Sequence, residues 1–336
     1  MSKLIIPENY SPIIVPMETQ RAIKKIKDYF QQELAYGLNL RRVSAPLFVD
    51  PETGLNDNLN GFERRVEFTV GDMDEKKVEI VQSLAKWKRM ALGKYGIKPG
   101  HGIYTDMDAI RRDEELDNLH SVYVDQWDWE KVITKEQRNT EFLHETVITI
   151  YNAVKNLGDY VNRLYRDIQT ELPNDIYFIT AQELEDLYPE KTPKERENLI
   201  TKAHSAVFIE KIGGTLRSGK KHDGRSPDYD DWELNGDILL WNEILEQAFE
   251  ITSMGIRVDA EAMDRQLRLA GCDDRRGLDF QKAVLGNELP YSVGGGIGQS
   301  RLCMYFLRKA HIGEVQVGVW PSDMIEACRK ANIFLL

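Results

Sequence analysis

Apolar residues recur every three or four positions in two long stretches of the chain, residues 18–36 and 140–172. This spacing places them on one face of an α-helix, so we expect an amphipathic helix in each stretch. Gly37 follows the first stretch, at a point where helices commonly end. Similar but shorter patterns predict helices near 84–92 and 181–203.

Shorter apolar runs predict strands between these helices. A hairpin is expected over 63–81, where two such runs flank a turn at Gly71. Pro46 interrupts the run 43–49, which is typical of an edge strand. Hairpins and long insertions favour an antiparallel sheet with helices on one side, the α+β class, built as one domain over 1–336. The remaining predicted strands are 123–129, 206–212, 237–241, 249–253 and 315–320.

The composition is that of a globular protein, with 42% hydrophobic and 29% charged residues in 336. No apolar run approaches the roughly 20 residues that span a bilayer, so we expect no membrane partner. The net charge of -11 gives no general attraction to nucleic-acid phosphates, so none is expected as a partner. The three cysteines form no C-x-x-C pair, which argues against structural zinc and fits a reducing cytoplasm.

Residues 294–301 read Gly-Gly-Gly-Ile-Gly-Gln-Ser-Arg. Gly294, Gly296 and Gly298 leave one face of an extended strand without side chains, so a flat ring or a phosphate has room against the backbone. Arg301 then offers a planar, permanently charged fork suited to stacking or to phosphate binding. The alternative is a mobile glycine-rich loop, which the apolar residues after Arg301 disfavour. The segment therefore indicates a nucleotide site.

Residues 214–220 fit the G-x-x-x-x-G-K spacing of a phosphate-binding loop, but Lys221 stands where that motif needs Ser or Thr. The residues that follow, 222–227, do not predict the helix whose N-terminus would hold the phosphates. We therefore expect an exposed, charged loop, which beside an active site would be placed to act as a lid.

Polar residues alternate with tryptophans in the strand predicted at 123–129. Gln126, Asp128 and Glu130 fall on one face, and Trp127 and Trp129 fall on the other. An amide and two carboxylates in a row suit the binding of a zwitterion. An exposed strand face is an equally good explanation of this cluster taken alone.

Two further polar segments are ambiguous by themselves. The basic segment 83–89, which includes Ser83 and Lys88, has the pattern of a solvated helix face. The stretch 55–61 around Asp57 has the composition of a turn.

Asp237 and Glu250 each lie at the edge of a predicted apolar strand, where an unpaired carboxylate would be costly. Two carboxylates on neighbouring strands form a hard-oxygen site for a Mg²⁺ ion already carried by a nucleotide. A buried salt bridge is the rival explanation, with Arg257 as one candidate partner.

The order of these segments resembles the three signature motifs of class II aminoacyl-tRNA synthetases. The helix before Gly37 leading to Pro46 resembles the first motif, which makes the dimer interface in that fold. The pattern Gly294-x-Gly296-x-Gly298-x-x-Arg301 matches the third motif at every fixed position.

The second motif requires an arginine followed two places on by an acid. Both Arg111 and Arg112 have this spacing, and Arg111 is favoured because it follows an apolar residue, Ile110. A histidine before a strand that ends Gln-x-Asp, here His120 and Gln126, is similar to the aspartyl/asparaginyl branch.

A closer resemblance is to the ammonia-dependent asparagine synthetases of bacteria, the aspartate–ammonia ligases. It spans roughly residues 18 to 321 and rests on the segments 83–89, 120–130, 227–232 and 294–301. The resemblance implies a class II synthetase-like antiparallel sheet flanked by helices, in a cytoplasmic homodimer. It also implies a reaction in which L-aspartate, ATP and ammonia give L-asparagine, AMP and pyrophosphate through a β-aspartyl-adenylate.

The same resemblance implies which residues bind ATP. Arg111 holds the α-phosphate, and Arg301 sandwiches the adenine or meets the γ-phosphate. Asp237 and Glu250 hold Mg²⁺. The glycines at 294, 296 and 298 complete the nucleotide site.

For the second half of this reaction, Asp57 and Asp230 are our candidates for holding ammonium and removing its proton before it attacks the adenylate. The charged groups of the substrate aspartate are implied to contact Ser83, Lys88, Gln126, Asp128, Ser253 and Arg257.

Two other functions fit parts of the pattern. One is an aspartyl/asparaginyl-tRNA synthetase-like catalytic core, against which stand the acidic chain and the lack of a region resembling an anticodon-binding barrel. The other is a non-catalytic paralogue, against which stand the intact Asp237, Glu250 and Arg301.

Overall fold

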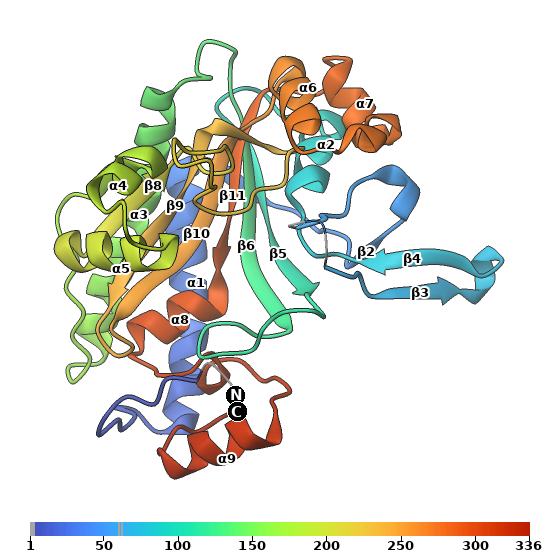
Figure 1. Ribbon diagram of the computed structural model, residues 1–336. Coiled ribbons are helices and arrows are strands. Elements are labelled where there is room, and N and C mark those ends of the chain that lie inside the picture. The colour runs from blue at the N-terminus through green and yellow to red at the C-terminus, as the bar shows by residue number, and fades with distance from the viewer. Residues whose placement is uncertain (1–3, 60, 62) are drawn as a thin grey trace.

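The computed structural model describes residues 4–59, 61 and 63–336. Within them the main sheet has eight strands in the order β1-β5-β6-β11-β10-β9-β8-β7 (Figure 1). Its pairs are antiparallel except at the two edges, where β1 pairs with β5 and β7 pairs with β8 in parallel. The α+β prediction is confirmed. The strands are β1 (Leu40–Arg42), β5 (Gly102–Ile110), β6 (Tyr123–Val132), β7 (Tyr177–Thr180), β8 (Ala206–Glu210), β9 (Asp230–Asn242), β10 (Gln247–Arg257) and β11 (Ser292–Gly298).

One face of this sheet packs on α1 (Pro16–Leu38), α3 (Thr140–Leu164) and α8 (Gln299–Phe306) to form the main core. Trp127 and Trp129 point into this core, as the alternation in β6 predicts. The glycine-rich segment is a strand whose end is fixed by the buried helix α8, as the apolar residues after Arg301 indicate. Gly37 does not end α1, because the helix continues to Leu38 and the left-handed residue that ends it is Asn39 (φ 59°).

The other face of the sheet is covered at its two sides and open between them. The helices α4 (Ala181–Leu187) and α5 (Pro193–His204) pack near β7, β8 and β9, and α2 (Ala85–Lys94) packs on β5 and β6. Two further helices, α6 (Ala260–Leu269) and α7 (Asp279–Leu285), form a small separate core beside α2 (Figure 1). The polar faces of β6, β10 and β11 lie between these two groups.

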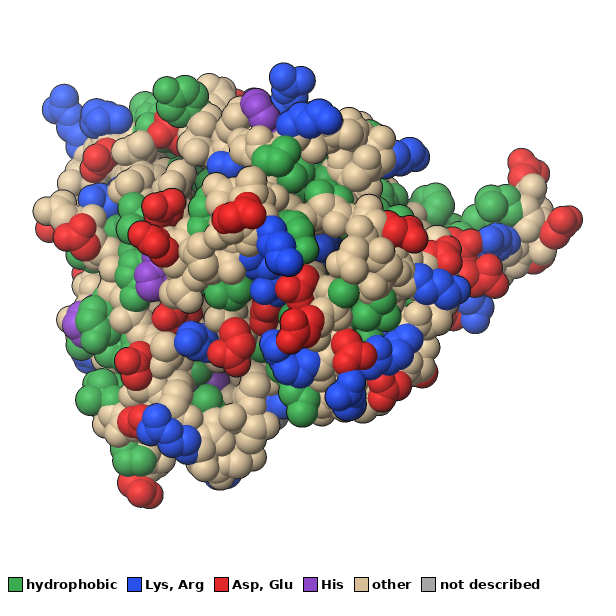
Figure 2. Space-filling model, turned by 90° about the horizontal axis from the view of Figure 1, so that it is seen from above, with side chains coloured by type: hydrophobic (Ala, Val, Ile, Leu, Met, Phe, Trp, Pro, Cys, Tyr) green, Lys and Arg blue, Asp and Glu red, His purple; other side chains and the backbone are tan. Residues whose placement is uncertain are grey.

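The hairpin predicted over 63–81 is present as β3 (Glu67–Val70) and β4 (Lys76–Ile80), which form a small sheet with β2 (Phe48–Val49). It projects from the body of the protein, with acidic and basic side chains interspersed along it (Figure 2). The run 43–49 is not one strand. Its start follows β1, its end is β2, and these belong to different sheets with Pro46 between them.

Three further sequence predictions about elements are wrong in extent or kind. The helix expected over 140–172 ends at Leu164. The helix expected over 181–203 is two helices, because Thr192 and Glu195 form a capping box that starts α5 at Pro193. The strand expected at 315–320 is absent, since Val317 and Val319 are 69% and 87% exposed and pack in no sheet. Helix α9 (Ser322–Lys330) follows.

None of the helices described over residues 4–59, 61 and 63–336 is long and apolar enough to cross a membrane.

Candidate active site

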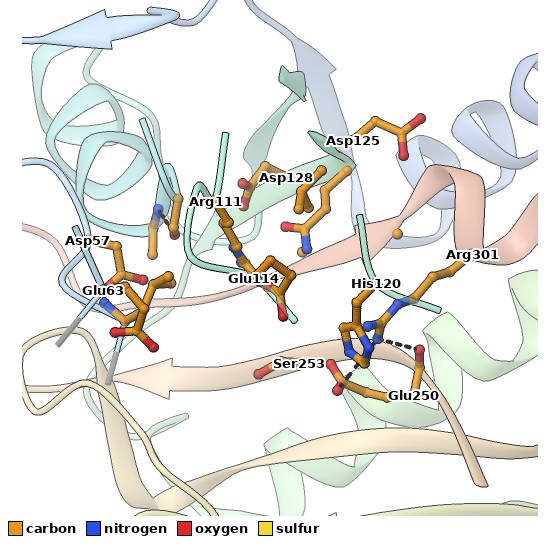
Figure 3. A pocket seen from close by; sticks show the side chains of 18 of the residues that line it. Asp57, Glu63, Arg111, Glu114, His120, Asp125, Asp128, Glu250, Ser253 and Arg301 are labelled. Carbon is orange, nitrogen blue, oxygen red and sulfur yellow. Dashed lines mark hydrogen bonds and ion pairs between the residues drawn. The ribbon is translucent and has the colours of Figure 1, made fainter. Parts of the chain in front are cut away.

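The open polar face of the sheet forms the floor of a cavity of about 650 Å³ (Figure 3). Strand β11 lies between β6 and β10, so residues of one face on three adjacent strands converge there. Most of the site residues predicted from the sequence line this cavity. They are Asp57, Ser83, Lys88, Arg111, Gln126, Asp128, Asp230, Glu250, Ser253, Arg257, Gly296, Gly298 and Arg301.

Arg111 and Arg301 line the same cavity from different elements (Figure 3). Arg111 directly follows β5, and Arg301 lies in the first turn of α8. The guanidinium of Arg301 is held by Glu250, since its Nη1 donates to the Glu250 carbonyl at 3.0 Å and lies 3.6 Å from Glu250 Oε2. Arg112, the other candidate for the second motif, lines a neighbouring cavity instead.

The face of β11 that the glycines leave bare is filled by protein side chains. A Cβ built on Gly294 would lie 2.0 Å from Glu130 Oε2, and one on Gly296 would lie 2.3 Å from Gln126 Oε1. Gly294 itself does not line the cavity. The glycines therefore make room for side chains from the flanking strands at these two positions, which differs from the bare surface expected from the sequence.

Lys88 is fixed at the bottom of the cavity, with 1% of its side chain exposed. It pairs with Asp128 on β6, and its Nζ also donates to the carbonyl of Gly295 at 3.0 Å. Burial lowers the pKa of Lys88, although the charge of Asp128 opposes this. Asp128 Oδ2 is buried and has no hydrogen-bond partner in the described part of the chain. One acceptor at the cavity floor is thus available to a cationic ligand.

Arg257 is the centre of a buried ion-pair group. Its Nη2 donates to Glu130 Oε2 at 2.7 Å, and its Nη1 pairs with Asp230. Burial raises the pKa of Asp230 even though Arg257 opposes it. Arg257 is therefore the partner of Glu130 and Asp230, not of Asp237 or Glu250.

Asp237 and Glu250 lie on the adjacent strands β9 and β10, and each has its own arginine. Asp237 pairs with Arg225, and Glu250 with Arg301. Burial, together with the charge of Glu250, raises the pKa of Asp237 to about 7 although Arg225 opposes it. Burial also tends to raise the pKa of Glu250, but the charges of Arg301 and Arg225 outweigh it and hold this pKa below the usual range.

These two carboxylates fit a Mg²⁺ ion that a nucleotide brings with it. Within the described residues, no three His, Cys, Asp or Glu side chains are grouped to hold a metal by themselves. Magnesium commonly takes one or two carboxylates and completes its shell with phosphate oxygens and waters. Glu250 lines the cavity and Asp237 does not, but the two carboxylates are close enough for the charge of Glu250 to raise the pKa of Asp237. Two oxygen donors this close on adjacent strands fit that mode.

Sequence reasoning missed Arg225 and Tyr229, which both line the cavity. They lie in the segment after the failed phosphate-binding motif. That motif itself forms a bend closed by a Thr215–Lys221 bridge, with no helix after it, as predicted. Tyr229 lies within the 227–232 segment that the resemblance uses. For Arg225 the only available signal was its position two places before that segment, which does not distinguish a site residue from a surface one.

The chain is similar to known proteins over its whole length. A family profile described as aspartate-ammonia ligase matches residues 17–332. The aspartate–ammonia ligase of Ruminiclostridium cellulolyticum is 60% identical over 336 residues, covering 100% of both chains. That of Clostridium tetani is 58% identical over 334 residues, covering 99% of this chain and 98% of the other.

Solved structures show the same fold at low sequence identity. An asparaginyl-tRNA synthetase of Pyrococcus horikoshii, complexed with asparaginyl-adenylate, is 14% identical with a TM-score of 0.63, covering 96% of this chain and 77% of that one. An asparaginyl-tRNA synthetase of Entamoeba histolytica, also with asparaginyl-adenylate, is 12% identical with a TM-score of 0.62, covering 90% and 66%. These likenesses concern the fold alone.

Proposed function

The chain belongs to the aspartate–ammonia ligase family, and we propose that it makes L-asparagine from L-aspartate, ammonia and ATP through a β-aspartyl-adenylate, releasing AMP and pyrophosphate. The observation that carries this proposal is that Arg111 and Arg301 line one cavity together with the Lys88–Asp128 pair. One cavity thus offers cations for a triphosphate beside a matched cation and anion for an amino acid.

Aspartate binds over β6 by its own charges. Lys88 receives the α-carboxylate, and Asp128, whose Oδ2 lacks a partner in the described residues, accepts from the α-ammonium. Gln126 and Ser253 line the same floor, and Ser83 lines the cavity just before α2. Arg257, held by Glu130 and Asp230, presents a fixed positive charge. Fixing the α-groups leaves the β-carboxylate directed at ATP, which sets the regiochemistry.

ATP binds between the two arginines. Arg111 holds the α-phosphate, where negative charge develops as the β-carboxylate attacks, and Arg301 contacts the nucleotide from the α8 side. Positioning and charge neutralisation of this kind account for most of the catalysis of phosphoryl and nucleotidyl transfer. Asp237 and Glu250 would hold Mg²⁺, which supplies neutralisation of phosphate charge when bound.

Ammonium binds on the side of the cavity where Asp57 and Asp230 lie. One carboxylate removes a proton, so that ammonia is the nucleophile that attacks the adenylate. We assign the proton transfer to Asp57, because Asp230 is paired with Arg257 and Asp57 has no ion pair in the described part of the chain.

We further propose that residues 1–336 form one catalytic domain, and that the chain acts as a cytoplasmic homodimer with the helix before Gly37 and the segment leading to Pro46 at the interface.

A product assay tests the activity. Purified protein is given aspartate, ATP, Mg²⁺ and either ammonium or glutamine, without tRNA, and asparagine, AMP and ADP are quantified. We expect asparagine and AMP in equal amounts with ammonium, and little asparagine with glutamine. ADP as the product would reject adenylate chemistry, and a requirement for tRNA would favour a tRNA ligase.

A further inference from the structure

The side chain of Arg225 extends from the loop 213–229 toward the two carboxylates proposed to hold magnesium, Asp237 and Glu250. Its Nη2 pairs with Asp237, and its Nη1 donates to the carbonyl of Gly224 at 3.3 Å. The Nε is buried and has no hydrogen-bond acceptor in the described residues. Arg225 also lines the cavity, with 13% of its side chain exposed.

We propose that Arg225 is an exchanging cation: it neutralises Asp237 before ATP binds and transfers to the phosphates when magnesium takes its place. This inference rests on the proposed function of the same cavity, and it assigns a nucleotide-contacting role to a residue that the family motifs used above do not include.

Charge balance is the first argument. Two ion pairs lie near each other here, Asp237 with Arg225 and Glu250 with Arg301, and all of these side chains except that of Asp237 line the cavity. A Mg²⁺ ion bound to both carboxylates would lie close to the Arg225 charge and repel it. The phosphates that accompany the ion carry more negative charge than the ion neutralises, so they attract the displaced guanidinium.

Reach is the second argument. The backbone just beyond Arg225 is anchored by Asp228, which is fully buried. Asp228 accepts from Ser226 Oγ at 2.7 Å and from Gln281 Nε2 at 2.7 Å, and it lies 3.2 Å from Lys86 Nζ. The loop is therefore held against α2 and α7 while the Arg225 side chain turns toward the cavity. The exchange needs a side-chain rotation and no loop opening.

The unpaired Nε is the third argument. A buried N–H without an acceptor is costly, so it marks a geometry that a ligand improves. A guanidinium that meets phosphate oxygens gains charge-assisted bonds, which are stronger than bonds between neutral groups.

The test compares two affinities for which the exchange predicts opposite changes. Mn²⁺ alone is titrated into the full-length protein and free Mn²⁺ is followed by its EPR signal. The complex of Mn²⁺ with α,β-methylene-ATP, which cannot be adenylated from, is titrated by calorimetry. For Arg225→Gln we expect the affinity for Mn²⁺ alone to rise about tenfold. We expect the affinity for the Mn²⁺–nucleotide complex to fall by a factor of about ten or more.

The matched control is Lys220→Gln, which removes the same charge from the same loop at an exposed position and should leave both affinities unchanged. Arg225→Lys keeps the positive charge but loses the planar guanidinium group. Its affinity for Mn²⁺ alone should therefore equal that of the wild type, and its affinity for the nucleotide complex should be lower. Circular dichroism checks that each variant is folded.

A structural role would lower both affinities of Arg225→Gln together, and that result, or no change in either, overturns the exchange. If the wild-type protein binds the nucleotide complex and only the Arg225 prediction fails, the proposed function stands without it. If the wild type binds no nucleotide complex, both are rejected.

Discussion

Glu130 on β6 and Arg257 on β10 form an ion pair across the strand that separates them, β11. Arg257 Nη2 donates to Glu130 Oε2 at 2.7 Å, and Ser292 Oγ donates to Glu130 Oε1 at 2.7 Å. Both side chains of the pair are buried. The pair passes over Gly294, which lacks the side chain that would block it. This contact gives Gly294 a structural purpose that is independent of any nucleotide.

Substituting Gly294 should therefore lower stability. An alanine Cβ there would lie 2.0 Å from Glu130 Oε2 and 2.5 Å from Arg257 Nη2, so one partner of a buried pair must move away from the other. Disrupting such a pair costs roughly 3–5 kcal/mol. We expect Gly294→Ala to lower the free energy of unfolding by about this amount, measured by urea denaturation. Gly277→Ala, where a Cβ meets open space, is the control and should be close to neutral; equal effects in the two variants would contradict this account.

The two arginines of the second motif should differ sharply in function. Arg111 lines the main cavity and Arg112 lines the neighbouring one. We expect Arg111→Gln to reduce aspartate-dependent ATP–pyrophosphate exchange by roughly 10²–10³-fold, as for other groups that stabilise developing charge. Arg112→Gln removes the same charge one residue away and should stay within about threefold of the wild type. The reverse order would move the motif register to Arg112.

Much of the fold could be predicted because burial is periodic in its long elements. In α1 the apolar side chains recur with helical spacing, and in β6 the tryptophans alternate with polar residues. Strand β5 could not be recognised in this way, because Thr105, Asp106 and Asp108 interrupt its apolar pattern. The run 315–320 alternates correctly but has no sheet to pack on, and periodicity alone does not report that.

From the periodic pattern, the site residues were predictable on strands and not in loops, for the same reason. Residues on the strands, such as Gln126 and Asp128, could be placed together because strand alternation fixes the face on which they lie. Arg225 could not, because its position depends on the burial of Asp228 against Lys86. That contact joins residues far apart in the chain, and no local pattern encodes it.

Stability should fall in acid in part because of His311, whose pKa burial lowers from its ordinary value near 6.5 to about 4. Because the unfolded chain gains the proton first, stability is complete above about pH 6.5 and declines as pH falls toward 4. About 2.5 pH units at 1.36 kcal/mol each give a loss of roughly 3 kcal/mol.

The variant His311→Asn isolates this contribution. His311 Nδ1 accepts from the backbone N–H of Gly313 at 3.0 Å, and an Asn side-chain oxygen offers an acceptor in a similar place without titrating in this range. We expect the variant to show a weaker fall in the free energy of unfolding between pH 6.5 and 4, measured by urea denaturation. Asp117 and Glu314, whose charges lie near His311, are unchanged in both proteins, so identical slopes would show that His311 does not titrate as stated.

Substitutions of the two candidate ammonium ligands, Asp57 and Asp230, should affect adenylate formation and asparagine formation differently. Asp57 Oδ1 accepts from the backbone N–H of Leu59 at 3.0 Å, a bond that Asn can also make, so Asp57→Asn preserves the local turn and removes only the base. We expect near-normal ATP–pyrophosphate exchange and a loss of asparagine formation of roughly 10²–10⁴-fold. Asp230→Asn should impair both steps, because it also removes a partner of buried Arg257. If Asp57→Asn instead reduces both steps equally, Asp57 does not act on ammonia.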